Sequence, residues 1–202
     1  MTRLQEAQRR DYRQRLLKAA RSVFSRSTYA QVSVEDIALK ADVSRTTFYR
    51  HFKNRLEIVA ALTEEFVAVL QGAHEVFFEG GRISEKTVGA WIDRNIAAYR
   101  RHVHLVRTIR EAAAIEPVFF RKHAIANHRI SIQKLGEVSP AFQRAAEATS
   151  ETDRCLTHAE FILRELDMLC YDVVVTGWDD GLAVGRGLVV AHFMEFHALY
   201  AN

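Results

Sequence analysis

Apolar residues recur at intervals of three and four along most of the chain, the spacing that places them on one face of an α-helix. In residues 10–26 these positions are held by Leu16, Ala20, Val23 and Phe24, with polar residues between them. The pattern therefore predicts a first helix over residues 10–26.

Two short helices are expected next, because each short apolar stretch follows a residue that suits a helix N-terminus. Ser33 has Asp36 three residues on, a variant of the capping box. Ser44 can cap a third helix that ends near Phe52. Only a three- to four-residue turn separates the two helices, which is the geometry of a helix-turn-helix.

The rest of the chain also has helical spacing. Asn54 can cap a long fourth helix that ends near Gly80 and Gly81. Further helices are expected over residues 84–102, 103–115, 117–135, 151–175 and 180–200, and no element is assigned to residues 136–150. With only 2 Pro and 9 Gly, the chain has too few turn residues for a β-sandwich or barrel. The predicted fold class is all-α.

Composition narrows the class of protein. The chain has 202 residues, of which 49% are hydrophobic and 26% charged, which is typical of a folded globular protein. Its two cysteines, Cys155 and Cys170, cannot frame a disulfide scaffold of this size and suit a reducing compartment. The first dozen residues lack the apolar segment of a signal peptide. Charged and histidine residues interrupt the apolar stretch 182–200, so a cytoplasmic protein without membrane association is expected.

Charge is distributed unevenly. Residues 1–60 contain 13 Lys and Arg against 6 Asp and Glu, a net charge of +7, whereas the remainder has a net charge of −4. A basic N-terminal third followed by an acidic remainder suggests a nucleic-acid-binding module joined to a different one. The alternative is a solvated basic face with no partner.

The expected helix-turn-helix lies between Ser33 and Phe52, in the sequence SVEDIALKADVSRTTFYRHF. Its second helix would lie in the major groove of DNA. The polar face of that helix has donors, methyl groups and an aromatic ring that can reach bases and phosphates. These residues are Arg45, Thr46, Thr47, Tyr49, Arg50 and His51. The sequence therefore predicts binding to double-stranded DNA.

Residues 16–59 resemble the DNA-binding domain of the tetracycline-repressor (TetR) family of transcriptional regulators. The matching motifs are A-x-x-V-F (Ala20, Val23, Phe24), S-V-x-x-I-A (Ser33, Val34, Ile37, Ala38) and V-S-x-x-T-x-Y-x-H-F (Val43, Ser44, Thr47, Tyr49, His51, Phe52). The resemblance implies a homodimer with an N-terminal three-helix DNA-binding domain and a C-terminal helical ligand-binding and dimerisation domain. It also implies a repressor that a small molecule releases from operator DNA. We place the two domains at residues 1–54 and 55–202.

The chain departs from the family pattern at four positions. Thr28, Asp42 and Thr46 replace frequent glycines, and Arg55 replaces a frequent lysine while keeping its positive charge. Asp tolerates a left-handed backbone better than most residues, so the turn at Asp42 is expected to persist. These differences are expected to change the preferred operator sequence rather than DNA binding itself.

The expected DNA-binding residues follow from residue type and from the resemblance. Arg45 and Thr46 are expected to read bases, Arg45 by forking onto a guanine and Thr46 by a methyl contact with thymine. Phosphate contacts are expected from Ser33, Thr47, Tyr49, His51, Lys53 and Arg55, and the surface also includes Ser44 and Arg50. For Tyr49, packing against the first helix is the alternative. The cluster of Arg9, Arg10 and Arg13 is either an arm that enters the minor groove or a solvated helix start.

Two helical stripes suggest a small-molecule site. Trp91, Asn95 and Tyr99 are spaced by four residues, as are Phe119, His123 and Asn127. Each stripe combines large apolar surface with a few polar groups, the usual composition of a ligand pocket. Phe161 and Met168 are further candidates. An unidentified, mostly apolar effector is expected, although the aromatic residues could instead form the core.

The last two expected helices have apolar residues on more than one face. One face can pack in its own domain and another against a second copy, which predicts a homodimer. The candidate interface residues are Leu163, Leu166, Cys170, Val189, His192 and Phe196.

Other functional classes receive little support from the sequence. It contains no nucleophile elbow, phosphate-binding loop or zinc-protease motif, so an enzyme is not expected, and neither are a cofactor and a metal ion. Cys155 and His158, three residues apart, could share a metal ion but do not form a complete ligand set. A closer alternative is a helical DNA-binding adaptor that dimerises without sensing a ligand.

Overall fold

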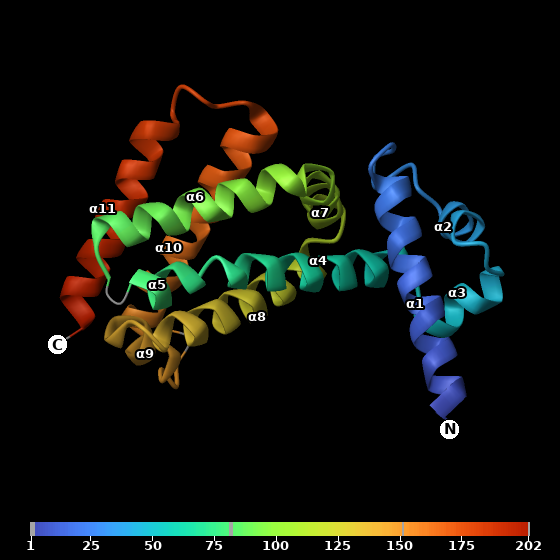
Figure 1. Ribbon diagram of the computed structural model, residues 1–202, viewed down its shortest axis with the longest axis horizontal. Coiled ribbons are helices and arrows are strands. Elements are labelled where there is room, and N and C mark those ends of the chain that lie inside the picture. The colour runs from blue at the N-terminus through green and yellow to red at the C-terminus, as the bar shows by residue number, and fades with distance from the viewer. Residues whose placement is uncertain (1–2, 81–82, 151, 202) are drawn as a thin grey trace. The chain divides into compact units, whose positions relative to one another are not determined.

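The computed structural model describes residues 3–80, 83–150 and 152–201, although not the side chains of residues 78–80, 119 and 122 (Figure 1). No strand occurs in this part of the chain, and the all-α prediction is confirmed. The helices are α1 (Arg3–Phe24), α2 (Val34–Lys40), α3 (Arg45–His51), α4 (Arg55–Gly72), α5 (Glu75–Gly80), α6 (Glu85–Arg101), α7 (Val103–Ile115), α8 (Pro117–Gly136), α9 (Pro140–Ala146), α10 (Arg154–Tyr171), the π-helix η1 (Asp172–Thr176) and α11 (Leu182–Tyr200).

The chain forms two compact units, neither of which is continuous in sequence. Unit 1 contains Met1–Phe66 and His104–Arg121, and unit 2 contains Val67–Val103 and Lys122–Asn202. Helix α4 therefore begins in unit 1 and ends in unit 2, and α7 belongs to unit 1. The boundary expected between residues 54 and 55 differs from this division.

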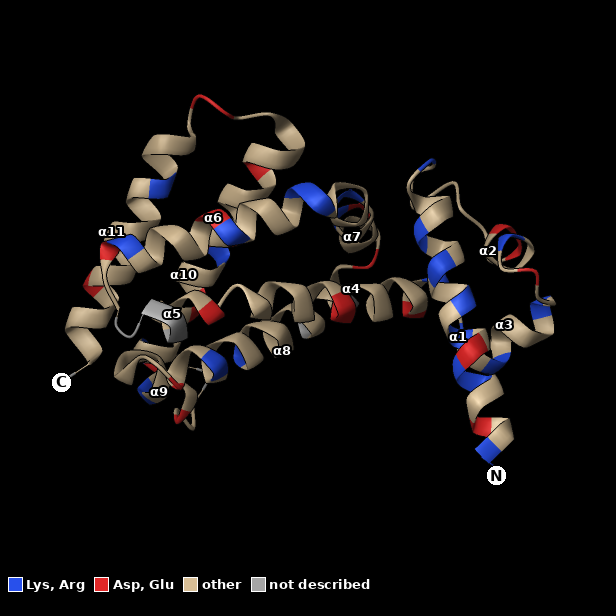
Figure 2. Ribbon diagram, viewed as in Figure 1, with Lys and Arg blue, Asp and Glu red and all other residues tan. Residues whose placement is uncertain are grey.

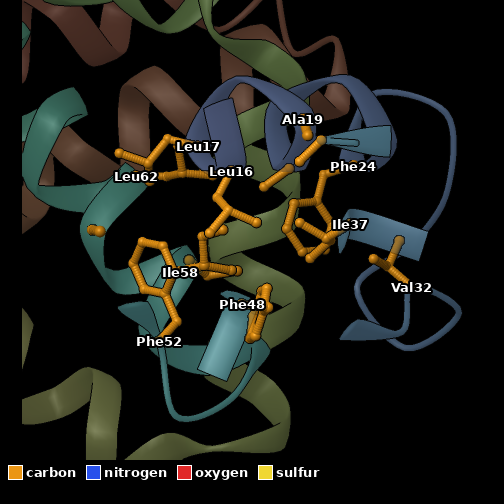
Figure 3. Packing of buried hydrophobic residues seen from close by; sticks show 14 of the residues in the cluster. Leu16, Leu17, Ala19, Phe24, Val32, Ile37, Phe48, Phe52, Ile58 and Leu62 are labelled. Carbon is orange, nitrogen blue, oxygen red and sulfur yellow. The ribbon is translucent and has the colours of Figure 1, made fainter. Parts of the chain in front are cut away.

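Unit 1 has a core to which every helix of the helix-turn-helix contributes (Figure 3). Leu16 of α1, Ile37 of α2, Phe48 of α3 and Ile58 of α4 are fully buried there. Burying each such side chain stabilises the fold by about 1.5–3 kcal/mol. Ala112 and Phe120 extend the same core into α7 and α8, which explains why the unit does not end at residue 54.

Local chemistry fixes the turns of the helix-turn-helix. The Ser33 hydroxyl accepts a hydrogen bond from the Asp36 amide at 3.1 Å, and the Asp36 carboxylate accepts one from the Ser33 amide at 2.8 Å, so the predicted capping box forms. The Ser44 hydroxyl accepts from the Thr47 amide at 3.0 Å. Asp42 has a φ of 52°, the left-handed conformation expected for this turn.

Unit 2 is built around aromatic side chains. The ring of Phe193 from α11 lies 5.5 Å from that of Trp91, 5.8 Å from that of Phe77 and 5.3 Å from that of Phe142, measured between centroids. Helix α11 is long and apolar enough to cross a membrane by length and composition. However, Phe193 and Phe196 of this helix are fully buried in the core, and Arg186 pairs with Asp93 of α6 at 2.9 Å.

Several helix boundaries differ from the predictions. Helix α1 begins at Arg3 rather than at residue 10. The long fourth helix ends at Gly72, and a turn at Ala73 and His74 separates it from α5. Helix α9 occupies residues 140–146, where no element was expected, and its N-terminus is capped by the Ser139 hydroxyl.

Candidate functional site

Helix α3 presents an exposed polar surface because its one buried residue, Phe48, anchors it to the core of unit 1. Arg45, Thr46, Tyr49 and Arg50 are exposed, and Thr47 is half-buried. Lys and Arg residues occur along α1 and at both ends of α3 (Figure 2). Unit 1 therefore has the exposed donors and the positive charge that a duplex-binding surface needs.

Arg45 is paired within the chain. Its Nη1 lies 2.6 Å from Glu35 Oε1, and its Nη2 lies 3.4 Å from the Tyr49 hydroxyl. The hydrogen bond to Tyr49 and the negative charge of Glu35 raise the pKa of Arg45. To contact a base, Arg45 has to break its ion pair with Glu35 and bind DNA instead.

The Tyr49 side chain packs against a residue of its own helix, α3. Its ring packs edge-on against Phe48, with centroids 5.6 Å apart, and its side chain remains exposed. This arrangement leaves the hydroxyl at the surface, where a phosphate can reach it.

Ser33 and Ser44 both serve as helix caps. The Ser33 hydroxyl also donates to the Asp36 carboxylate at 2.6 Å, so its proton is already used. The Ser44 hydroxyl lies 3.0 Å from that of Thr47, and either can donate outward. Ser44 and Thr47 are therefore better placed than Ser33 to donate to a phosphate.

The guanidinium of Arg55 already has hydrogen-bond partners within unit 1. Its Nη1 donates to the carbonyl oxygens of Tyr29, Ala30 and Val32 at 3.0, 3.2 and 2.7 Å. Its guanidinium also lies 4.4 Å from the centroid of the Tyr29 ring. Arg55 therefore holds together the loop between α1 and α2, and the expected phosphate contact would compete with these three acceptors. Lys53 is exposed, with its Nζ 3.6 Å from Glu57.

His51 lies within a group of arginines. Burial lowers its pKa, and the charges of Arg9, Arg13 and Arg50 lower it further. Arg13 also lies over the ring of Phe52, at 4.6 Å from its centroid. Because α1 begins at Arg3, the cluster at residues 9–13 lies within a helix, and whether it reaches the minor groove remains a prediction. Sequence reasoning did not place these arginines beside the end of α3.

The first ligand stripe is buried, and its polar groups meet partners in the chain. Trp91 Nε1 donates to His74 Nδ1 at 3.0 Å, and Asn95 Nδ2 donates to the Trp91 carbonyl oxygen at 2.8 Å. The Tyr99 hydroxyl donates to the Asp167 carboxylate. These residues therefore contribute to the core of unit 2.

The other ligand candidates are separated in the structure. His123 and Asn127 are half-buried on α8, and the side chain of Phe119 lies outside the described part. Phe161 and Met168 are 56% and 63% exposed on α10, because the opposite face of that helix enters the core. Both therefore lie outside the core of unit 2, and their role as ligand contacts remains a prediction.

Most of the expected interface residues are core residues. Cys170 and Phe196 have no exposed surface in the single chain, and Leu163, Leu166 and Val189 are also buried. They offer little surface to a second copy in this conformation, and their place at the interface remains a prediction. His192 is half-exposed, and its Nδ1 lies 2.9 Å from Glu165 Oε2. The exposed apolar side chains of α10 and α11 are Phe161, Met168, Val184, Leu188 and Leu199.

Sequence reasoning missed His74, which accepts the hydrogen bond of the Trp91 indole. His74 is 3% exposed, and its Nε2 is buried with no hydrogen-bond partner. The sequence offers no signal for this arrangement beyond a histidine close to the end of an apolar helix.

Comparisons with known proteins agree with this arrangement. Residues 16–62 match the family described as bacterial regulatory proteins, tetR family. No curated protein sequence matches the chain. A structure of the fatty acid degradation regulator FadR from Bacillus halodurans is similar with a TM-score of 0.61 and 14% identity, over 89% of this chain and 94% of that one. A TetR transcriptional regulator from Rhodococcus sp. RHA1 is similar with a TM-score of 0.59 and 17% identity, over 94% of this chain and 97% of that one.

Proposed function

We propose that this chain, whose residues 16–62 match the tetR family of bacterial regulatory proteins, is a cytoplasmic repressor that a small molecule releases from operator DNA. The observation that carries the DNA-binding role is the geometry of α3. Phe48 anchors this helix, Ser44 caps it, and its donors face solvent.

Binding as a homodimer would present two copies of α3 to two half-sites related by a two-fold axis. The exposed apolar residues of α10 and α11 support this assembly, because a second copy packed on these helices would remove apolar surface from water. Arg45 and Thr46 would read bases, whereas Lys53, Arg50 and Tyr49 would contact phosphates.

Ligand control would act as a shift between two conformations, since a ligand moves an equilibrium only by its difference in affinity for the two states. Helix α4 offers a covalent path for this shift, because it belongs to both units. The aromatic interior of unit 2 suits a mostly apolar ligand.

The test is a binding titration with duplex DNA from the region that adjoins the protein's own gene. A dimer that neutralises about ten phosphates is expected to give a log–log salt slope of about −9. A footprint with two-fold symmetry supports the proposal. Binding that is insensitive to salt, or equal for a scrambled duplex, would overturn it.

The second candidate is an adaptor that dimerises and senses nothing. It is favoured by the internal hydrogen bonds of Trp91, Asn95 and Tyr99, which leave these groups satisfied without a ligand. The unpartnered Nε2 of His74 favours the sensing repressor.

A further inference from the structure

The hydrogen bond between Trp91 and His74 fixes which nitrogen of His74 carries a proton. An indole N–H can only donate, so the Nδ1 atom that accepts it at 3.0 Å has no proton. In the neutral ring the proton is therefore on Nε2. His74 presents a donor of known position and tautomer.

That donor has no partner among the described residues, because Nε2 is buried without a hydrogen bond there. An unmet buried donor costs about 1–3 kcal/mol, so a protein gains by supplying an acceptor for it. Burial, and next the charge of Lys134, lower the pKa of His74 to about 4. At neutral pH the ring is thus an uncharged donor.

The surroundings of His74 are aromatic. The Trp91 ring lies 5.9 Å from the His74 ring, and the Phe77 ring lies 5.8 Å from that of Trp91, between centroids. The backbone amides of Ala73 and His74 donate to carbonyls three residues earlier at 3.0 Å, which holds the turn in place. Aromatic rings of this kind suit contact with an apolar ligand.

Residues on both sides of this turn line a surface pocket. The pocket has a volume of about 400 Å³ and is lined by Ala68, Gln71, Gly72, Glu75 and Lys134. Four of these residues flank His74 in sequence, and the fifth is the lysine whose charge acts on the His74 ring.

The charges at this pocket disfavour a carboxylate ligand. Lys134 already pairs with Glu137 at 2.9 Å, and Glu75 adds a negative charge. A buried carboxylate would meet the neutral donor of His74 and a lysine that Glu137 already neutralises, which does not offset the loss of its hydration. A neutral acceptor avoids that cost.

We propose that unit 2 recognises an apolar compound with a neutral carbonyl group, whose oxygen accepts the Nε2 proton of His74. The carbonyl belongs to a ketone, ester or amide, and the rest of the compound packs against the ring of Trp91. This assignment rests on the proposed ligand-sensing function and names the chemistry of its ligand.

Three probes with one skeleton test the assignment. They are 5-phenylpentan-2-one, its alkene isostere 2-methyl-5-phenylpent-1-ene, and the carboxylate 4-phenylbutanoate. Their affinities for the full-length protein are measured by following the indole ¹⁵N–¹H signal of Trp91. We expect the ketone to bind about tenfold or more weakly to His74→Phe than to the wild type, and the alkene to change less than about threefold.

Two further variants keep the result interpretable. His74→Gln can both accept from Trp91 and donate to a ligand, so it is expected to retain the ketone's affinity if the hydrogen bond is what matters. His104→Phe makes the same chemical change at an exposed position of unit 1 and is expected to change nothing. If His74→Phe does not fold, the comparison uses His74→Gln with His74→Asn, whose shorter amide cannot span both partners.

The proposal is overturned if the wild type does not bind the ketone at millimolar concentration, or if the ketone and alkene lose equal affinity on substitution. Preferred binding of 4-phenylbutanoate also overturns it. Operator binding is measured on the same samples. A ketone that binds through His74 without releasing DNA refutes the sensing function alone, whereas release by a probe that does not need His74 refutes the site alone.

Discussion

Arg55 is expected to contribute more to the stability of unit 1 than to its affinity for DNA. Its Nη1 lies within hydrogen-bond distance of three carbonyl oxygens in the loop between α1 and α2. Hydrogen bonds from charged groups contribute about 1.5–3 kcal/mol each, and two N–H groups must here be shared among three acceptors in a half-exposed site. We expect Arg55→Met to lower the free energy of unfolding by about 2–3 kcal/mol.

In a chain of this length, a loss of that size lowers the melting temperature by about 4–12 °C. Lys53→Met is the matched control, because Lys53 is 87% exposed and its Nζ is 3.6 Å from Glu57. That change is expected to leave the melting temperature within about 1 °C, since isolated surface ion pairs contribute little. It should reduce the salt slope of DNA binding by about 0.9 for each subunit, because one phosphate contact is lost.

Thermal unfolding and fluorescence anisotropy over a salt series are therefore measured for both variants. The reasoning is refuted if Arg55→Met melts like the wild type and reduces the salt slope as Lys53→Met does. Arg55 would then be a phosphate ligand, as its position in the sequence suggests.

Three other predictions concern different parts of the chain. Glu35→Gln should strengthen binding to scrambled duplexes a few fold, because it frees Arg45 from its ion pair. Arg45→Ala should instead weaken discrimination at one base position per half-site by at least about fivefold. Competition titrations with operator variants measure both effects, and unchanged binding contradicts them. Leu188→Asp should give a folded monomer by light scattering, whereas Phe196→Asp should unfold unit 2; a dimer that survives Leu188→Asp excludes this face. The pKa of His74 falls from 6.5 in the unfolded chain to about 4 in the folded protein, so the unfolded chain binds more protons between these pH values. The stability that is present above pH 6.5 should therefore fall by up to about 1.4 kcal/mol per pH unit on acidification. Denaturation of His74→Gln at several pH values should show a smaller loss, and a pH profile identical to that of the wild type contradicts the assignment.

The parts of the structure that depend on neighbouring residues could be predicted from the sequence. The caps at Ser33 and Ser44 and the left-handed turn at Asp42 each involve groups within a few residues, so their types and spacing were sufficient. The exposed donors of α3 followed from Phe48, which had to face the core. For this reason the exposed face of α3 could be predicted from the sequence.

Features that depend on distant parts of the chain could not be predicted. The partners of Arg55 are more than twenty residues away, and the turn at His74 is held partly by Trp91, seventeen residues on. Helices α10 and α11 are apolar on several faces, so their periodicity cannot show whether Phe196 or Leu188 lies inside. Only the packing of the other helices decides that.

The discontinuity of unit 1 restricts how this protein can be recombined with its relatives. A chimera that takes only residues 1–66 leaves behind Ala112 and Phe120, which cover its core, and Glu111, whose carboxylate accepts from the Tyr29 amide at 2.6 Å. The transplanted residues 1–66 would expose apolar surface and would leave the Tyr29 amide without its hydrogen-bond acceptor. The smallest part of unit 1 that can be exchanged therefore consists of two segments of the chain. A substitution in residues 1–66 that faces the core is tolerated only if the residues of α7 still pack against it.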